Sequence, residues 1–484
     1  MDKLSIKNIL KFISITQLAL SVFFLLPVIT GYIYKENANN FLIFVILSFI
    51  FSGSIFFALR NHKVELNVKE GILAVNLVWI LLGFMGAFPL VLYTNVSLSS
   101  GFFEAISGFT TTGATVYTDI ESLPKMVLML RSLTHWLGGM GIIVLGVGLF
   151  SIINPSGSLA LFKAESTGIK TEKLTPKIKD TALRLWGVYA LITLLDIVAL
   201  HLEGMSIFDA INHAFATIST GGFSTKNASL GYFNDNSIII WTTTVFMIIS
   251  GMNFLAHLRF FYNDMSGYET EENIWYIKIF VILGFALSMI HYETTEDSLY
   301  FSMTHGFFTI ASVLTTTGFV TLNYEAWGHF AVVVVFLAMF IGGNTGSTAG
   351  GMKVVRYIVL LKSLALEIKK ILYPNALLSI FLNGSKVKEN VLSATSGFFM
   401  LFVISNAVLT LYLYARGYDA LTSVSAAIAC VGNIGPGFGL VGPVDNYAFF
   451  SWYDKIILAI FMIIGRLEFY TVVLLFSKNF WKKF

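Results

Sequence analysis

The chain has 484 residues, of which 56% are hydrophobic and only 12% are charged, and its formal net charge is +3. Soluble proteins have roughly a quarter of their residues charged, so this composition excludes an ordinary soluble protein. The single cysteine, Cys430, also excludes an intrachain disulfide and a cysteine-based metal cluster.

Ten apolar segments are long enough to cross a membrane as helices, which takes about 20 residues each. In chain order they are 12–33, 41–59, 71–93, 125–153, 181–202, 237–260, 274–291, 328–373, 391–414 and 453–477. The N-terminal sequence MDKLSIKNILKF is basic and enters the first segment without a small-residue cleavage site. We therefore expect a retained first helix and not a removed signal peptide.

The basic residues predict on which side of the membrane the chain ends lie. They gather before the first segment, between the fourth and fifth, and after the tenth: Lys3, Lys7, Lys11, Lys163, Lys170, Lys173, Lys177, Lys179, Lys478, Lys482 and Lys483. By the positive-inside rule these stretches are cytoplasmic, and ten crossings put both termini there. The loop 263–273 is acidic, but acidic residues contribute little to orientation.

A polar segment that carries glycine recurs four times. The copies read FTTTGAT at 109–115, ISTGGFS at 218–224, LTTTGFV at 314–320 and GNIGPGF at 432–438, each after a short apolar segment. A small residue lies six places before each aligned glycine: Ser107, Ala216, Ser312 and Ala429. The pattern predicts an all-α polytopic membrane protein, with an N-terminal helical hairpin and four repeats of helix, pore helix, filter loop and helix around one pore.

The predicted units follow this repeat. They are the N-terminal hairpin 1–68, the first pore repeat 69–158, a linker with the second repeat 159–263, the third repeat 264–373 with a broken second helix, and a linker with the fourth repeat 374–484.

The segments before the glycines are too short to span and too apolar for external loops, which indicates re-entrant half-helices. Four loops around one axis would supply backbone carbonyls that replace the hydration shell of a cation. Taken singly, each loop also fits a tight extracellular turn. The candidate selectivity filter comprises Thr110, Thr111, Thr112, Gly113, Ser219, Thr220, Gly221, Gly222, Thr315, Thr316, Thr317, Gly318, Gly432, Asn433, Ile434 and Gly435.

These motifs resemble the TrkH/TrkG/KtrB superfamily of bacterial potassium transporters over essentially the whole chain. Beyond the four loops, the sequences that resemble the family are HWLGGMGIIVLGVGLF at 135–150, LFKAESTGIKTEKLTPKIKDTA at 161–182, NTGSTAGGMKVVR at 344–356 and GRLEFYTVVLL at 465–475. The hairpin at 12–59 makes the chain more similar to TrkH-like than to KtrB-like members. The second and fourth loops depart from the threonine-rich pattern, which implies fewer well-formed ion sites.

The resemblance implies potassium uptake across the bacterial inner membrane, with potassium at the filter carbonyls of Gly113, Gly222, Gly318 and Gly435. It also implies a homodimer with a pore in each subunit and a cytosolic ring of TrkA-like RCK domains. A regulatory nucleotide (ATP/ADP or NAD) is expected only on that partner, because this chain has no GxGxxG or Walker loop after a strand. A lipid membrane is the expected surroundings, and no nucleic-acid partner is expected. Passive flow and sodium- or proton-coupled symport both stay open.

The eighth apolar segment, 328–373, would form a helix of about 69 Å, over twice the hydrocarbon core. We therefore expect it to break at GGNTGSTAGG, and the resemblance implies a flexible intramembrane gate there. The alternative is a simple glycine kink that fills a packing groove. The candidate gate residues are Gly342, Gly343, Asn344, Thr345, Gly346, Ser347, Thr348, Ala349, Gly350 and Gly351.

Arg466 lies in the middle of the last apolar segment, where a charge is costly and normally faces a cavity or the helix bundle. We interpret it as part of the gate, a positive charge below the filter that slows cations, which the family's matching arginine supports. The alternative is a structural ion pair with another helix. Glu468, two residues further on, lies near the opposite helical face.

Two other functional classes need weighing. An ion-coupled secondary transporter of a small solute also uses broken helices at mid-membrane, although four repeats of one orientation are not typical of it. An intramembrane enzyme would need clustered acids or a nucleophile with its base, and no aspartate-rich, HExxH or GxSxG motif occurs. The sequence therefore predicts a transport protein and not an enzyme.

Overall fold

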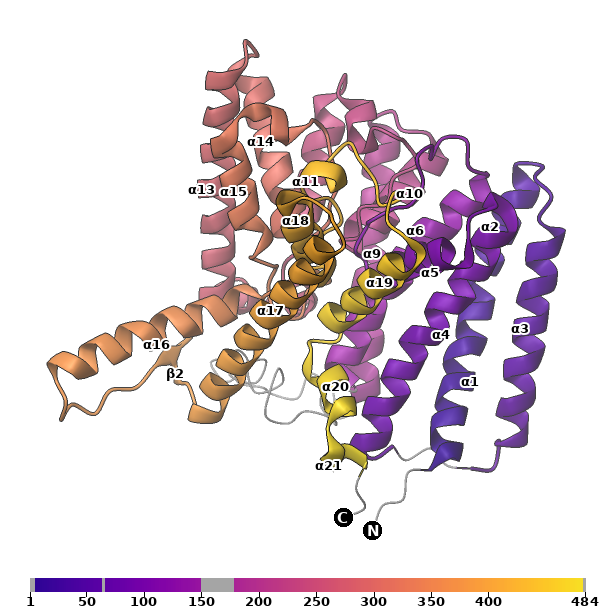
Figure 1. Ribbon diagram of the computed structural model, residues 1–484, viewed down its shortest axis with the longest axis horizontal. Coiled ribbons are helices and arrows are strands. Elements are labelled where there is room, and N and C mark those ends of the chain that lie inside the picture. The colour runs from indigo at the N-terminus through magenta and orange to yellow at the C-terminus, as the bar shows by residue number, and fades with distance from the viewer. Residues whose placement is uncertain (1–4, 63–65, 149–177, 482–484) are drawn as a thin grey trace.

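The computed structural model describes residues 5–62, 66–148 and 178–481, and helices dominate it. Strands in these ranges form one antiparallel pair, β1 (Phe381–Leu382) and β2 (Ser385–Lys386). Figure 1 shows the start of α1 (Ile6–Phe23) and the last helix, α21 (Lys478–Trp481), at the same end of the molecule. The two ends of the described chain thus lie on one side, as an even number of crossings requires.

The chain begins with the predicted helical hairpin. It consists of α1, α2 (Leu25–Ile33) and α3 (Asn39–Ala58), and α1 packs along α3. The hydroxyl of Ser5 caps α1 by accepting a hydrogen bond from the backbone N–H of Asn8. Much of α3 faces outward with large apolar side chains, as expected for a helix in contact with lipid.

The order long helix, short helix, loop, second helix then recurs four times. The first copy has α4 (Val68–Thr94), α5 (Leu98–Phe109) and α6 (Lys125–Gly148). The second has α9 (Ile178–Leu202), α10 (Ile207–Ile218), η1 (Ser229–Phe233), α11 (Ser237–Ser250), α12 (Phe254–Phe260) and η2 (Met265–Gly267). The third has α13 (Glu271–Thr294), α14 (Leu299–Leu314), η3 (Tyr324–Trp327), α15 (His329–Met339) and α16 (Val354–Leu372). The fourth has α17 (Glu389–Ala415), α18 (Ala420–Val431), η4 (Gly439–Val441), α19 (Trp452–Arg466), α20 (Tyr470–Val473), η5 (Leu474–Phe476) and α21.

The four short helices, α5, α10, α14 and α18, form the centre of the molecule. Ten of the twelve residues of α5 are buried, as are nine of twelve in both α10 and α18. In α3, by contrast, three of twenty residues are buried, and in α13 seven of twenty-four. The long helices therefore surround the short ones and separate them from lipid.

The second helix is interrupted in the second, third and fourth copies. The axis turns by 99° between α11 and α12 and by 114° between α19 and the segment Tyr470–Phe476. In the third copy, residues 340–353 separate α15 from α16, as the sequence predicts, and α16 projects sideways from the body (Figure 1). The expectation of continuous helices over 237–260 and 453–477 is therefore wrong, because Gly251–Asn253 and the positive-φ residues Glu468 and Phe469 break them.

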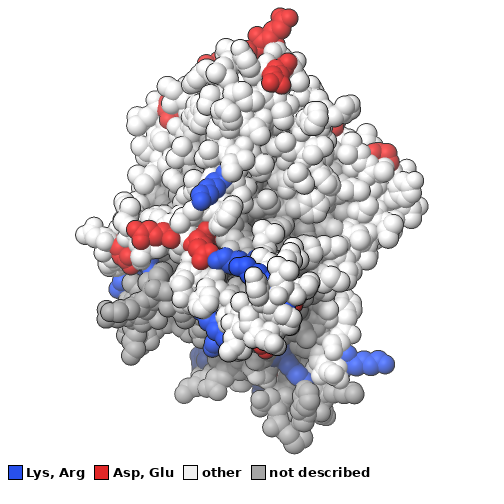
Figure 2. Space-filling view, turned by 90° about the vertical axis from the view of Figure 1, so that its left-hand side faces the viewer, with Lys and Arg blue, Asp and Glu red and all other residues white. Residues whose placement is uncertain are grey.

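Six helices of the described chain are long and apolar enough to cross a membrane, or up to eight if each bent pair is one span. Helix α15 has only 11 residues, and α6 ends where the described range ends, so the count of ten stays a prediction. Figure 2 shows a region of mostly uncharged side chains above mid-height on one side of the molecule, with charged side chains gathered at and below mid-height. Most of the predicted basic linker at 161–182 lies outside the described residues.

Candidate functional site

Each short helix points its C-terminal end at one of the four glycine loops. A side-chain oxygen caps its start by accepting a hydrogen bond of 3.0–3.2 Å from the backbone N–H three residues on. The capping residues are Ser97, Ser206, Ser298 and Asp419. The opposite ends carry the negative pole of the helix dipole, so all four favour a cation at the loops.

The four loops have one backbone conformation although they share only the final glycine. The second residue of each has a positive φ, 54° at Thr111, Thr220 and Asn433 and 58° at Thr316. The third residue donates a hydrogen bond of 2.7–2.9 Å to the carbonyl five places earlier. Those acceptors are the small residues that the sequence aligned: Ser107, Ala216, Ser312 and Ala429.

The final glycines form a closed ring. A Cβ atom on Gly113 would lie 2.3 Å from the carbonyl oxygen of Gly221 in the second loop. A Cβ atom on Gly222 would lie 2.0 Å from the carbonyl oxygen of Thr317 in the third loop. A Cβ atom on Gly318 would lie 2.0 Å from the carbonyl oxygen of Ile434 in the fourth loop. Gly435 closes the ring, because a Cβ atom on it would lie 2.6 Å from the carbonyl oxygen of Thr112 in the first loop. The four loops thus surround one axis in sequence order, and their backbones approach too closely for any side chain.

The fourfold order of the backbone does not extend to the side chains. In the first loop the hydroxyls of Thr110 and Thr112 lie 2.7 Å apart, and the Thr315 and Thr317 hydroxyls repeat this in the third loop. The other two loops lack this threonine pair, and the amide of Asn433 instead donates to the hydroxyl of Thr112 at 3.0 Å. What all four loops share is the backbone arrangement, in which each third-position carbonyl oxygen lies beside the final glycine of a neighbouring loop.

A cavity of about 80 Å³ opens on one side of the ring, lined by all four glycines. Arg131, Lys226 and Asp445 contribute charge to its wall. Beside it, both carboxylate oxygens of Glu325 accept a hydrogen bond from the backbone N–H of Gly439 at 3.2 Å, joining the third and fourth copies. Burial raises the pKa of Glu325. The hydrogen bond from Gly439 lowers this pKa, whereas the negative charge of Asp445 raises it further.

The predicted gate segment lies on the opposite side of the ring from this cavity. The hydroxyl of Thr348 donates to the carbonyls of Ile218 and Ser250 at 3.1 and 3.2 Å, below the second loop. The backbone N–H of Gly350 donates to the hydroxyl of Thr316 in the third loop at 2.6 Å. A Cβ on Gly350 would lie 2.5 Å from the carbonyl oxygen of Gly432 in the fourth loop. The segment therefore contacts three of the four loops.

The base of this segment is closed and fastened. Ile341 forms an isolated parallel bridge with Met352, so the two ends of residues 342–351 lie together. The carboxylate of Glu272, at the start of α13, accepts hydrogen bonds from the backbone N–H groups of Thr345 and Val355 at 2.8 and 3.1 Å. Glu272 is not among the residues predicted from the sequence, because an acidic residue in the first turn of a helix is too common to mark a functional position.

Arg466 ends α19 beside the gate segment, and its side chain is buried. Its guanidinium donates to the carbonyls of Thr348 at 2.8 Å and of Gly138 at 3.4 Å. It forms no ion pair with a described residue, and Glu468 pairs instead with Arg356 at 2.9 Å. Among the described residues, Arg466 therefore does not form the structural ion pair given as the alternative. Its hydrogen bonds connect the gate segment to α6.

The chain is similar to known transport proteins over almost its whole length. The TrkH family profile, described as cation transport protein, matches residues 37–278 and 273–483. The "Trk system potassium uptake protein TrkH" of Vibrio parahaemolyticus is 36% identical, with 98% of this chain and 99% of that protein covered. TrkG of Escherichia coli (strain K12) is 35% identical, with 94% of each chain covered.

Solved structures agree with this relationship. The crystal structure of the potassium transporter TrkH from Vibrio parahaemolyticus superposes with a TM-score of 0.88 at 34% identity, and the match covers 98% of this chain and 99% of that one. The fold, the family profile and the near-complete coverage all relate the chain to the same family. The chain therefore belongs to the TrkH family of cation transport proteins.

Proposed function

We propose that this protein takes up potassium across the inner membrane of a bacterium, through a single pore whose selectivity filter is the ring of four loops. The observation that carries the proposal is the closed ring of Gly113, Gly222, Gly318 and Gly435 against the carbonyl oxygens of the neighbouring loops. The names of the relatives, which are potassium uptake proteins, support potassium as the transported ion.

The filter would work by replacing water with backbone oxygens. A cation that enters the ring exchanges its hydration shell for the carbonyls of Thr112, Gly221, Thr317 and Ile434. The C-terminal ends of four buried half-helices add favourable potential at the same point. The differing side chains of the second and fourth loops would leave fewer equivalent sites along the axis than in a fully symmetric channel.

Residues 342–351 and Arg466 would form the gate on the inner side of this filter. The contacts of Thr348 and Gly350 with three loops support a closed state in which the segment obstructs the inner end of the pore. A buried guanidinium at the same level would repel a permeating cation. Glycine-rich backbone between fixed ends can move without disturbing α15 or α16.

Regulation would come from outside this chain. The name "Trk system" of the relatives supports a system of several components, and we propose a cytosolic TrkA-like ring that binds ATP/ADP or NAD. We also propose a homodimer with cytoplasmic termini. An inward electrical potential supplies about 2.3 kcal/mol per charge per 100 mV, so uptake would not require symport with sodium or protons.

Cation flux into liposomes that contain the purified protein tests the proposal. We expect potassium and rubidium to enter faster than sodium and lithium, and Gly318→Ser to abolish that preference. Gly417→Ser is the matched control, because Gly417 also has a positive φ (94°, against 80° at Gly318) but nothing within 4 Å of an added Cβ. It should keep the preference for potassium.

Two results would contradict the proposal. Wild-type protein that carries no cation under any gradient, with the partner ring added, would favour an ion-coupled transporter of a small solute. A Gly318→Ser protein that folds and still prefers potassium would show that the ring of glycines is not the filter.

A further inference from the structure

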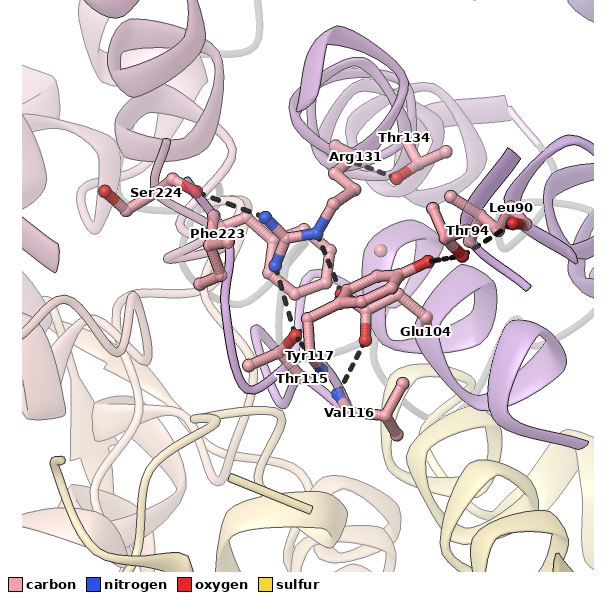
Figure 3. A network of polar contacts seen from close by, with 12 residues as sticks. Leu90, Thr94, Glu104, Thr115, Val116, Tyr117, Arg131, Thr134, Phe223 and Ser224 are labelled. Carbon is pink, nitrogen blue, oxygen red and sulfur yellow. Dashed lines mark hydrogen bonds and ion pairs between the residues drawn. The ribbon is translucent and has the colours of Figure 1, made fainter. Parts of the chain in front are cut away.

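A buried ion pair lies behind the first two candidate filter loops (Figure 3). Glu104 on α5 and Arg131 on α6 are 1% and 2% exposed, and the Nε of the arginine donates to the Oε1 of the glutamate at 2.8 Å. Two buried charges cost several kcal/mol of desolvation, which is offset only when further hydrogen bonds satisfy both groups. Here those further bonds go to the filter loops.

Glu104 holds the exit of the first loop. Its Oε1 accepts from the hydroxyl of Thr115 at 3.0 Å, and its Oε2 accepts from the backbone N–H of Val116 at 2.8 Å. These residues follow Gly113 by two and three positions. The backbone segment that follows the first loop is therefore attached to α5, the half-helix that precedes the loop.

Arg131 extends the same network to the second loop. One terminal nitrogen donates to the carbonyl of Ser224 at 3.1 Å, and the other to the hydroxyl of Thr115 at 3.3 Å. The guanidinium lies 4.1 Å from the ring centre of Phe223, which directly follows Gly222. Figure 3 shows the guanidinium between Thr115 and Ser224, so one side chain sets the spacing of two loop exits.

The other three half-helices also hold their own loop exits. In the second copy the carboxylate of Asp209 on α10 accepts from the hydroxyl of Thr225 at 2.6 Å and lies 3.5 Å from the ammonium of Lys226. The imidazole of His213 lies 2.8 Å from the hydroxyl of Ser224, and that of His305 lies 2.9 Å from the hydroxyl of Thr321. In the fourth copy the hydroxyl of Ser425 accepts from the backbone N–H of Phe438 at 3.0 Å. The ion pair in the first copy is the more buried of the two, with side chains 2% and 0% exposed against 16% and 12% in the second copy. Its arginine also reaches the neighbouring loop.

We propose that the Glu104–Arg131 pair is a positioning device that sets the preference of the pore for potassium over sodium. It fixes the distance between the first and second loops, and so between the carbonyls of Thr112 and Gly221 that face the ion. Selectivity in a carbonyl filter depends on the size of the ring and on the number of oxygens that reach the ion. The inference rests on the proposed function of the ring.

Arg131→Lys tests the device without removing its charge. Lysine keeps a positive group beside Glu104, but its single ammonium cannot reach Thr115 and Ser224 as the planar guanidinium does. We expect the ratio of potassium to sodium flux in liposomes to fall by about fivefold while potassium flux persists, because one net hydrogen bond between the loops is lost. A merely structural pair would change the yield of folded protein and leave the ratio alone.

Arg416→Lys is the matched control, because Arg416 faces the buried Asp454 at 3.4 Å and donates to no filter-loop residue. Its flux ratio should stay at the wild-type value. If Arg131→Lys does not fold, the neutral double variant Glu104→Gln with Arg131→Gln replaces it, with the same expected fall.

An unchanged ratio in whichever variant folds would overturn the inference and leave the proposed filter intact. Wild-type protein without any preference for potassium would overturn both.

Discussion

At the scale of single residues, the four ring glycines are fixed by two independent constraints. Their φ values, 80–100°, lie in the region that costs a residue with a side chain about 1–2 kcal/mol. A side chain would in addition collide with a carbonyl oxygen 2.0–2.6 Å away. The second constraint does not follow from the first, because it is absent at Gly417, which also has a positive φ.

Arg466 is the residue whose removal should open the pore. We expect Arg466→Ala to raise basal potassium flux about tenfold or more, since the nearby charge opposes the ion by more than 1.4 kcal/mol. The variant also loses the bond to the Thr348 carbonyl that holds the gate segment. Flux assays in liposomes without the partner ring measure the effect.

Arg466→Lys serves as the control for charge, since it keeps the positive group and should stay closer to wild type. An alanine variant that folds and conducts at or below the wild-type rate would contradict a role in the gate.

The loops that form the ring and the segment proposed as the gate stand out in the sequence because each carries a local signal. A threonine–glycine string after a short apolar segment, or five glycines within ten residues, is visible without any knowledge of the fold. Glu104, Arg131 and Glu272 had no such sign. Glu272 contacts Thr345 and Val355 across 73 and 83 residues, and only the folded chain brings them together.

At the scale of elements, the gate segment is a loop whose two ends, Ile341 and Met352, lie together. The bridge between Ile341 and Met352 closes its base, and Lys353, just after the segment, donates to the carbonyl of Ala349 at 2.5 Å. Because the two ends of the segment lie together, a shorter chain can still join them. The segment can therefore be altered while α15 and α16 keep their places.

Deleting residues 346–350 should raise basal flux, because the variant lacks both contacts that cover the inner ends of the loops. Thr348→Ala is the matched control, since it removes the bonds to Ile218 and Ser250 but keeps the length. We expect a rise of intermediate size from it. Flux in liposomes, with thermal unfolding to establish that each variant is folded, gives the comparison. A folded deletion variant with unchanged or lower flux would show that the segment does not obstruct the pore.

The half-helices were predictable as elements, whereas the breaks in two second helices were not. Length and apolarity identify α5, α10, α14 and α18, and their serine and aspartate caps mark their starts. The break after α19 carries no glycine or proline signal at its turning point, since Glu468 and Phe469 adopt positive φ there. Such a conformation needs tertiary support, here the ion pair of Glu468 with Arg356, and propensity alone does not reveal it.

At the scale of the whole molecule, one chain supplies all four sides of the ring. The order of contacts, from the first loop to the second, third, fourth and back to the first, closes within a single subunit. A symmetric channel assembled from identical chains must have four equal loops, whereas this chain can vary each one. The threonine pairs of the first and third loops and the amide of Asn433 in the fourth are such variations.

A closed ring in each chain predicts that the subunits of a homodimer conduct independently. In a dimer purified through two different tags, with Gly318→Ser in one subunit only, we expect sodium flux to be half that of the doubly substituted dimer. The unaltered subunit should still exclude sodium, because no residue of its ring comes from the partner. Dimers with Gly417→Ser in one subunit are the control and should exclude sodium throughout. A mixed dimer with the full sodium flux of the double variant would mean that the two subunits share one pathway, and a single-chain filter would then be wrong.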